Sequence, residues 1–263
     1  MLNNSTFSDN VAGFNGGAVF LYDNSTTDIN NCSISNSMVG DSGGAAYGRK
    51  NSTISISNSI ADNITAENSG GAVYAQQDSN VIIETSNFTN NTADYGGVVR
   101  VYIRSTASIT DSSFSGNKGD LSGGVTAAYK NSTMKIQTCN FTFNAASFGS
   151  VSVAYNSNIT FENNTVLSNN AQLGGVMRVL QAEAVVIVGS TFRYNTAGSG
   201  GVLYVQGSNL TVETSLLQYN SARYDGGVLY TESSCVTVTT TTCLLYTSPS
   251  PRDATLSRMP SSA

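Results

Sequence analysis

Short runs of alternating apolar and polar residues recur along most of the chain. Residues 52–60 (STISISNSI), 80–88 (NVIIETSNF) and 209–217 (NLTVETSLL) alternate with a period of two. That period predicts β-strands with one buried face. Other runs, such as residues 98–103 (VVRVYI) and 202–205 (VLYV), are almost continuously β-prone, and none has the period of an amphipathic helix. The pattern therefore predicts a series of short strands without helices.

Glycine pairs divide these runs into regular units. The pairs begin at Gly16, Gly43, Gly70, Gly96, Gly123, Gly149, Gly174, Gly200 and Gly226. Successive pairs are 25 to 27 residues apart, so the chain contains a structural repeat. In one unit Ser150 replaces the second glycine. We therefore expect the first glycine of each pair to adopt the positive φ that glycine tolerates without steric cost.

A second marker precedes each glycine pair. It begins with an apolar residue, at Phe7, Ile34, Ile60, Phe88, Phe114, Phe141, Val166, Phe192 and Leu217. Three residues later stands a polar residue, which is Ser37 in one unit and otherwise Asn10, Asn63, Asn91, Asn117, Asn144, Asn169, Asn195 and Asn220. We expect the apolar residues to stack in the core. We expect the Asn residues, which tolerate left-handed backbone, to form an interior ladder in which each amide donates to one coil and accepts from the other.

Three short strands per repeat, with no helix between them, predict one turn of a parallel β-solenoid. The all-β fold expected for residues 1–242 is a right-handed parallel β-helix of about nine coils. Each coil buries its inner face against its neighbours, so the stability of the rod is collective. Because the chain enters the repeat in mid-unit, we interpret it as a fragment of a longer protein.

The markers resemble the polymorphic outer membrane protein repeat, whose signatures are GGA[ILV] and FxxN. Residues 16–19 and 70–73 (both GGAV) match the first signature. Residues 7–10 (FSDN), 88–91 (FTNN), 114–117 (FSGN), 141–144 (FTFN) and 192–195 (FRYN) match the second, whereas later glycine pairs drift to GGV. The resemblance implies a right-handed β-helix of the pectin-lyase-like fold, and in the family such repeats form the passenger of cell-surface adhesins. The membrane-barrel domain of the bacterial members is not found in this sequence, so autotransport is not carried over.

Composition and charge argue against several classes of function. Charged residues make up 11% of the 263 residues, the formal net charge is −5, and there is no His. A nucleic-acid binder needs a basic surface, and a His-ligated metal or a His general base needs an imidazole. No apolar run is long enough to predict a membrane-spanning helix. We expect no cofactor, no metal, no nucleic-acid partner and no membrane span.

The resemblance also implies where a catalytic site would lie. Enzymes of the pectin-lyase-like fold carry their active groups on the outer face of the strand that follows the glycine pair. Two columns of outward positions are expected there, four and six residues beyond the first glycine. Of these eighteen residues only Glu232 is a carboxylate, whereas glycoside hydrolysis requires an acid–base pair. Asp41, Asp94, Asp120 and Asp225 are scattered in the loops before the glycine pairs. We expect a non-catalytic protein; the alternative is a fragment of a carbohydrate-active enzyme whose catalytic coils lie outside this region.

The same two columns contain most of the candidate binding residues. Stacked aromatic rings beside guanidinium groups are suited to hold a glycan or a partner protein. The candidates are Tyr47, Tyr74, Arg100, Tyr102, Tyr129, Tyr155, Arg178, Tyr204 and Tyr230. The alternative interpretation is that these cross-coil pairs only stabilise the face of a sheet.

The cysteines and the N-glycosylation sequons bear on the cellular location of the protein. Cys32 and Cys139 lie four coils apart, roughly 19 Å at the strand spacing of a sheet, which is too far for a disulfide. Sequons recur at or beside the turn after the strand that follows the glycine pair, at Asn24, Asn51, Asn131, Asn158 and Asn209. Asn63 also begins a sequon, but its expected place in the interior ladder excludes a glycan. We expect an adhesive or structural protein of the cell surface or extracellular space.

The last residues do not continue the repeat. Residues 243–263 contain all three prolines and no glycine. In one reading frame, residues 243–253 back-translate into a transposase-type sequencing-library adapter, and residues 257–263 match the flow-cell primer that follows it. We interpret residues 243–263 as the translation of that adapter and exclude them from the fold.

Overall fold

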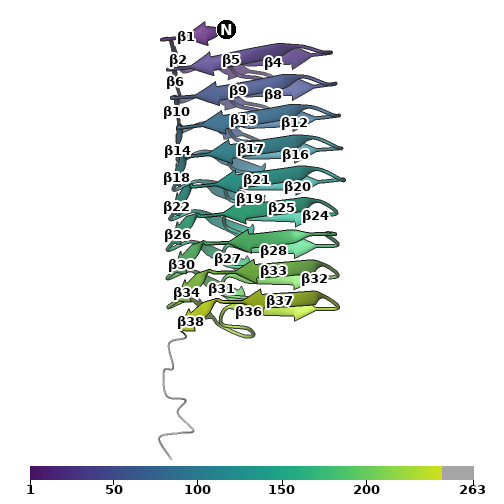
Figure 1. The fold of residues 1–263 in the computed structure, drawn as a ribbon. Coiled ribbons are helices and arrows are strands. Elements are labelled where there is room, and N and C mark those ends of the chain that lie inside the picture. Colours follow the sequence, from purple (N-terminus) through teal and green to yellow (C-terminus); the bar gives the residue numbers. More distant parts are fainter. Residues whose placement is uncertain (245–263) are drawn as a thin grey trace, which may run out of the picture.

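The computed structural model describes residues 1–244 and contains four parallel sheets and no helix within that range (Figure 1). Each complete coil contributes one strand to each sheet. The prediction of a right-handed parallel β-helix of about nine coils is confirmed, but the prediction of three strands per coil is wrong. A short fourth strand lies between the apolar marker and the glycine pair, where the polar sequence gives no alternating pattern.

We name the sheets A, B, C and D in chain order. Sheet A contains β1 (Leu2–Asn3), β5 (Thr26–Asn30), β9 (Thr53–Ser57), β13 (Asn80–Glu84), β17 (Thr106–Thr110), β21 (Thr133–Gln137), β25 (Asn158–Glu162), β29 (Val185–Val188), β33 (Asn209–Glu213) and β37 (Cys235–Thr239). Sheet B contains β2 (Thr6–Ser8), β6 (Ser33–Ser35), β10 (Ile60–Asp62), β14 (Asn87–Thr89), β18 (Ser113–Ser115), β22 (Asn140–Thr142), β26 (Thr165–Leu167), β30 (Thr191–Arg193), β34 (Leu216–Gln218) and β38 (Thr242–Leu244).

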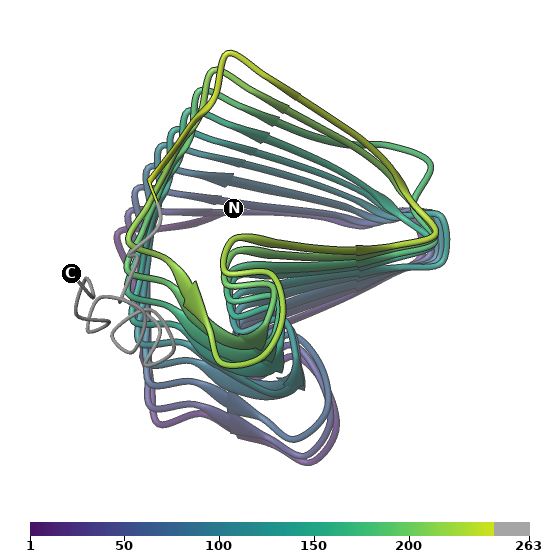
Figure 2. The same cartoon turned by 90° about the horizontal axis from the view of Figure 1, so that it is seen from below.

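Sheets C and D complete the coil. Sheet C contains β3 (Val11–Ala12), β7 (Met38–Val39), β11 (Thr65–Ala66), β15 (Thr92–Tyr95), β19 (Lys118–Ser122), β23 (Ala145–Phe148), β27 (Asn170–Leu173), β31 (Thr196–Ser199) and β35 (Ser221–Ala222). Sheet D contains β4 (Val19–Tyr22), β8 (Ala46–Arg49), β12 (Val73–Gln76), β16 (Val99–Tyr102), β20 (Thr126–Tyr129), β24 (Ser152–Tyr155), β28 (Met177–Leu180), β32 (Leu203–Gln206) and β36 (Leu229–Glu232). Viewed along the stack, the segment from sheet C to sheet D folds back, so the coil outline is concave there (Figure 2).

The predicted boundary between repeat and adapter falls inside the last strand. Cys243 pairs with Leu217 and Leu244 with Gln218, so β38 continues sheet B. The remainder of the interpreted adapter, residues 245–263, lies outside the described residues.

The core is a set of columns running along the rod. Phe88, Phe114 and Phe141 occupy equivalent positions in sheet B and are completely buried. Their rings stack with centroid separations of 5.2 and 5.0 Å. Alternate residues of sheets A and D fill the rest of the interior, which explains the period of two in the sequence.

An asparagine ladder runs beside the phenylalanine column. In Asn117, Oδ1 accepts bonds from both the backbone N–H and the Nδ2 of Asn91, each 3.0 Å long. Its Nδ2 donates to the carbonyl oxygen of Phe88 and to Oδ1 of Asn144. The same pattern continues through Asn169 and onward, and the buried members are Asn91, Asn117, Asn144, Asn169, Asn195 and Asn220. The predicted ladder is confirmed for these six residues.

The ladder prediction is wrong for Asn63. Sheet B pairs Ala61 with Phe88, so Ala61 occupies the core column and Ile60 is 48% exposed. The ladder position of this coil is consequently Ile64, and Asn63 is exposed at the corner before it. The two apolar residues at 60 and 61 allowed two phases, and only coil pairing distinguishes them.

Two further details of the ladder differ from expectation. Asn10 stands at a ladder position, but Ser37 follows it in the next coil and the Nδ2 of Asn10 has no hydrogen-bond partner. The left-handed residue is the one before the ladder position, for example Asn90 with φ 54° or Phe143 with φ 56°. The ladder residues themselves do not have positive φ.

Serine ladders satisfy the backbone at two other corners. Between sheets D and A, the N–H of Ser52 donates to Oγ of Ser79, and that of Ser79 to Oγ of Ser105. Between sheets A and B, Cys32 and Cys139 occupy the equivalent serine position, and both thiols are free and buried. Burial raises the pKa of the Cys139 thiol to about 12, so this thiol stays protonated at neutral pH.

The glycine prediction is confirmed in every repeat, since all nine first glycines have positive φ. The second glycine has a different role. A Cβ on Gly71 would collide with the carbonyl oxygen of Gly97 in the next coil. The pair therefore combines a left-handed turn with close approach between coils.

Replacing Asn144 by Ala is expected to destabilise the protein by about 3 kcal/mol. The change leaves the N–H and Nδ2 of Asn117 and the carbonyl of Phe114 without their buried partners. Urea unfolding followed by circular dichroism measures the change. Asn140→Ala, an exposed position of the same coil, is the control and should change stability by less than about 0.5 kcal/mol. Equal effects of the two substitutions would contradict the role of the ladder.

Candidate binding surface on sheets C and D

All nine predicted binding residues lie on the outer face of sheet D. Val73 and Ala75 of β12 are completely buried in the core, so Tyr74 between them points outward. Coil pairing aligns Tyr74 with Tyr47 on one side and Arg100 on the other. The two outward columns expected from the sequence are therefore present in the structure.

The first part of this face is packed tightly. Tyr47 and Tyr74 are only 4% and 8% exposed, and their rings make an edge contact at 5.3 Å. Arg100 lies 4.6 to 5.6 Å from the centroids of four tyrosine rings, and its Nη1 donates to Oγ of Ser69. The four tyrosines are Tyr74, Tyr95, Tyr102 and Tyr129. These contacts match the alternative interpretation, in which the side chains stabilise the sheet face.

Burial of Tyr47 and Tyr74 narrows the predicted ligand site. A ligand stacks on a ring only if the ring is accessible, and these two rings are buried. Tyr129 is likewise engaged, because its hydroxyl lies 2.7 Å from Oγ of Ser122. Tyr102 has a lysine above its ring, with Nζ of Lys130 4.9 Å from the centroid.

The second part of the face is more open. Tyr204 and Tyr230 stack with centroids 4.6 Å apart and ring planes 7° from parallel, and both rings are partly exposed. Arg178 lies beside them, 5.7 Å from the centroid of Tyr204. Its Nε has no hydrogen-bond partner, and burial lowers the pKa of its guanidinium. Tyr155, in the second column, is 40% exposed.

The aromatic and guanidinium groups of this face can stack on a ligand and donate hydrogen bonds to it, but the two columns contain no pair of carboxylates. Glu232 is their single acid, as the sequence indicates. Asp120 of sheet C forms an ion pair with Lys118 at 2.5 Å. Within residues 1–244, His, Cys, Asp and Glu side chains nowhere gather in threes as metal ligands, and no helix is both long and apolar enough to cross a membrane.

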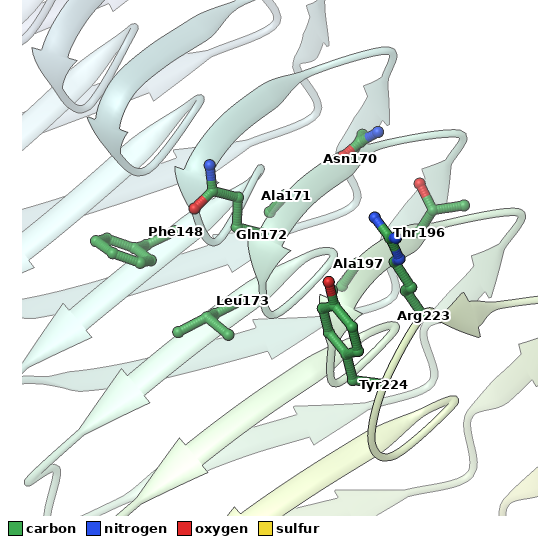
Figure 3. A pocket seen from close by; sticks show the side chains of 10 residues that line it. Phe148, Asn170, Ala171, Gln172, Leu173, Thr196, Ala197, Arg223 and Tyr224 are labelled. Atoms are coloured by element: carbon green, nitrogen blue, oxygen red, sulfur yellow. The ribbon is translucent and has the colours of Figure 1, made fainter.

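A pocket that the sequence did not predict lies over sheet C. Its volume is about 650 Å³. Figure 3 shows Phe148 and Leu173 on one side and Thr196, Arg223 and Tyr224 on the other. Phe148 also carries Arg178 above its ring at 4.1 Å, so the pocket adjoins the open part of sheet D. A signal was present in the sequence, since Arg223 and Tyr224 stand together before a glycine pair.

The predicted glycosylation residues occupy two kinds of position. Asn24, Asn51 and Asn131 are exposed, with positive φ, in the turn between sheets D and A. Asn158 and Asn209 are instead the first residues of β25 and β33. The expectation that Asn63 is shielded is wrong, because its side chain is exposed.

Comparison with known protein families identifies the family of this chain. Residues 47–243 match the family described as "Right handed beta helix region", and the chain belongs to that family. No curated protein and no solved structure matches the chain.

The buried tyrosines predict a loss of stability at alkaline pH. Burial raises the pKa of Tyr74 from 10.0 to about 12, although Arg100 opposes the shift. Between pH 10 and about pH 12 the folded protein keeps the Tyr74 proton, whereas the unfolded chain has lost it. The contribution of Tyr74 to stability is therefore fully present below this window and is lost as the pH rises through it. Tyr74→Phe is expected to reduce the loss between about pH 9 and about pH 11 by about 1 kcal/mol. Denaturant unfolding at both pH values measures it, and an equal reduction by Tyr155→Phe would contradict the assignment.

Proposed function

We propose that this chain is a non-catalytic adhesive or structural module of a secreted or cell-surface protein, and that it binds a glycan or a protein through the open part of sheet D. The observation that carries the proposal is the partly exposed Tyr204–Tyr230 stack beside Arg178, which has an unpaired Nε. Accessible aromatic rings next to a guanidinium are enriched in binding surfaces. The resemblance to adhesin repeats of the pectin-lyase-like fold supports the same role.

The shape of the module suits presentation of such a surface. At about 4.8 Å per coil, nine coils form a rod of roughly 43 Å. Each coil is paired with its neighbours along four sheets, so the rod resists bending. A partner bound on sheet D would be held at a fixed position along it.

An extracellular location is supported by the corners of the coil. Asn24, Asn51 and Asn131 present sequons in exposed turns, where an attached glycan meets no core residue. The chain has few charged residues and no predicted nucleic-acid surface. Both features fit a solvated outer wall rich in Asn, Ser and Thr.

Binding should depend on the exposed aromatic stack. We expect the double variant Tyr204→Ala/Tyr230→Ala to bind cells or arrayed glycans at least about tenfold more weakly, because it removes the stacking platform. The matched control is Thr211→Ala/Thr237→Ala, an outward pair on sheet A in the same two coils. Labelled protein on cells and glycan arrays measures binding, and circular dichroism verifies folding. A folded aromatic variant that binds as well as the control would overturn the proposal.

A further inference from the structure

The pocket over sheet C arises from a change in the path of the chain. β31 runs from Thr196 to Ser199, but its neighbour β35 ends at Ala222. Beyond that point the backbone N–H groups of Arg223 and Tyr224 donate to the carbonyls of Ala197 and Gly198 at 3.0 and 2.8 Å. The following loop therefore forms a wall instead of another flat strand.

Gly198 supplies the room inside this wall. It has no side chain, and a Cβ built on it would lie 3.7 Å from Cδ2 of Tyr224. The same Cβ would be 2.6 Å from the carbonyl oxygen of Gln172, closer than real contacts allow. The backbone of sheet C thus excludes a side chain at this place and leaves the floor beneath the Tyr224 ring open.

The lining combines apolar walls with one charge. Phe148, Leu173, Ala197 and the ring of Tyr224 are apolar surfaces, and Asn170, Gln172 and Thr196 add neutral polar groups. Arg223 is the single charged lining residue, and its guanidinium lies 5.3 Å from the centroid of Tyr224. A second guanidinium, that of Arg178, lies behind the Phe148 ring. Asp225 follows Tyr224 in the chain but is not part of the lining.

From this lining we propose that the pocket binds a peptide segment of a partner protein in which a bulky apolar side chain stands next to a carboxylate. The apolar walls fit the side chain, and a guanidinium with no carboxylate in the lining fits the acid, which it can bind in bidentate geometry. A saccharide can stack its C–H face on one ring, but its remaining hydroxyl groups would find no hydrogen-bond partner along Phe148 and Leu173. The inference adds a second site, on sheet C, to the proposed binding face on sheet D.

Three blocked tetrapeptides test the chemistry on the full chain. The first has adjacent Phe and Asp, the second has Lys in place of Asp, and the third has Ser in place of Phe. Amide chemical shifts of the protein, followed during titration, measure affinity and location. We expect the first peptide to bind with a Kd of about 1 mM or less, shifting residues 196–198 and 223–224, and the other two to bind at least about fivefold more weakly.

Two variants locate the site. Arg223→Gln should weaken the first peptide about fivefold or more and remove the preference for Asp over Lys. Arg104→Gln, which removes an exposed guanidinium elsewhere on the rod, should change neither. Because Arg223 is exposed, folding is not expected to depend on it, and Tyr224→Ala gives a second test of the apolar wall.

Three outcomes would overturn the inference. Equal binding of the Asp and Lys peptides, unchanged binding by Arg223→Gln, or tighter binding of glucuronate than of the first peptide would each do so. The result is independent of sheet D. Failure of the peptides with cell or glycan binding still lost in the Tyr204/Tyr230 variant rejects only this pocket, and the reverse pattern rejects only the proposed function.

Discussion

Every coil is joined to the next at the same axial spacing, so the buried asparagine amides must find hydrogen-bond partners in the neighbouring coils. The asparagine ladder satisfies this constraint completely at Asn117, Asn144, Asn169 and Asn195. Each Oδ1 accepts two bonds from one neighbour, and each Nδ2 donates to a carbonyl on that side and to an amide on the other. A buried amide is costly when unpaired, so the ladder fixes the register in which the phenylalanine column stacks.

This constraint separates the interior from the outer faces. Because stacking inside fixes which residues pair, the outward residues of one sheet also align in columns, whatever their chemistry. In the first part of sheet D, Arg100 is enclosed by four tyrosine rings and stabilises the outer face of the sheet. Further along, Arg178 has fewer rings around it and lies between the pocket wall at Phe148 and the partly exposed Tyr204. The same residue type is thus enclosed by four tyrosine rings in one coil and borders the open part of sheet D in another.

The repeat, the glycine turns and the outward columns of sheet D could be predicted from sequence because each depends on local spacing. The phase at Ile60 and Ala61 could not, since both residues fit the apolar marker and only pairing with Phe88 selects Ala61. Sheet C was missed because its strands are short and polar. The burial of Tyr47 and the pocket beside Tyr224 depend on the path of the chain from sheet C to sheet D, which no spacing along the sequence encodes.

The most direct test of the central claim is hydrogen exchange of the asparagine side-chain amides by nuclear magnetic resonance. The structure predicts slow exchange for the Nδ2 protons of Asn117, Asn144, Asn169 and Asn195, because both protons of each amide are bonded inside the rod. Asn140 and Asn63, which are exposed, should exchange rapidly. Rapid exchange of the ladder amides, at the rate of Asn140, would contradict the ladder as the interaction that sets the register of the fold.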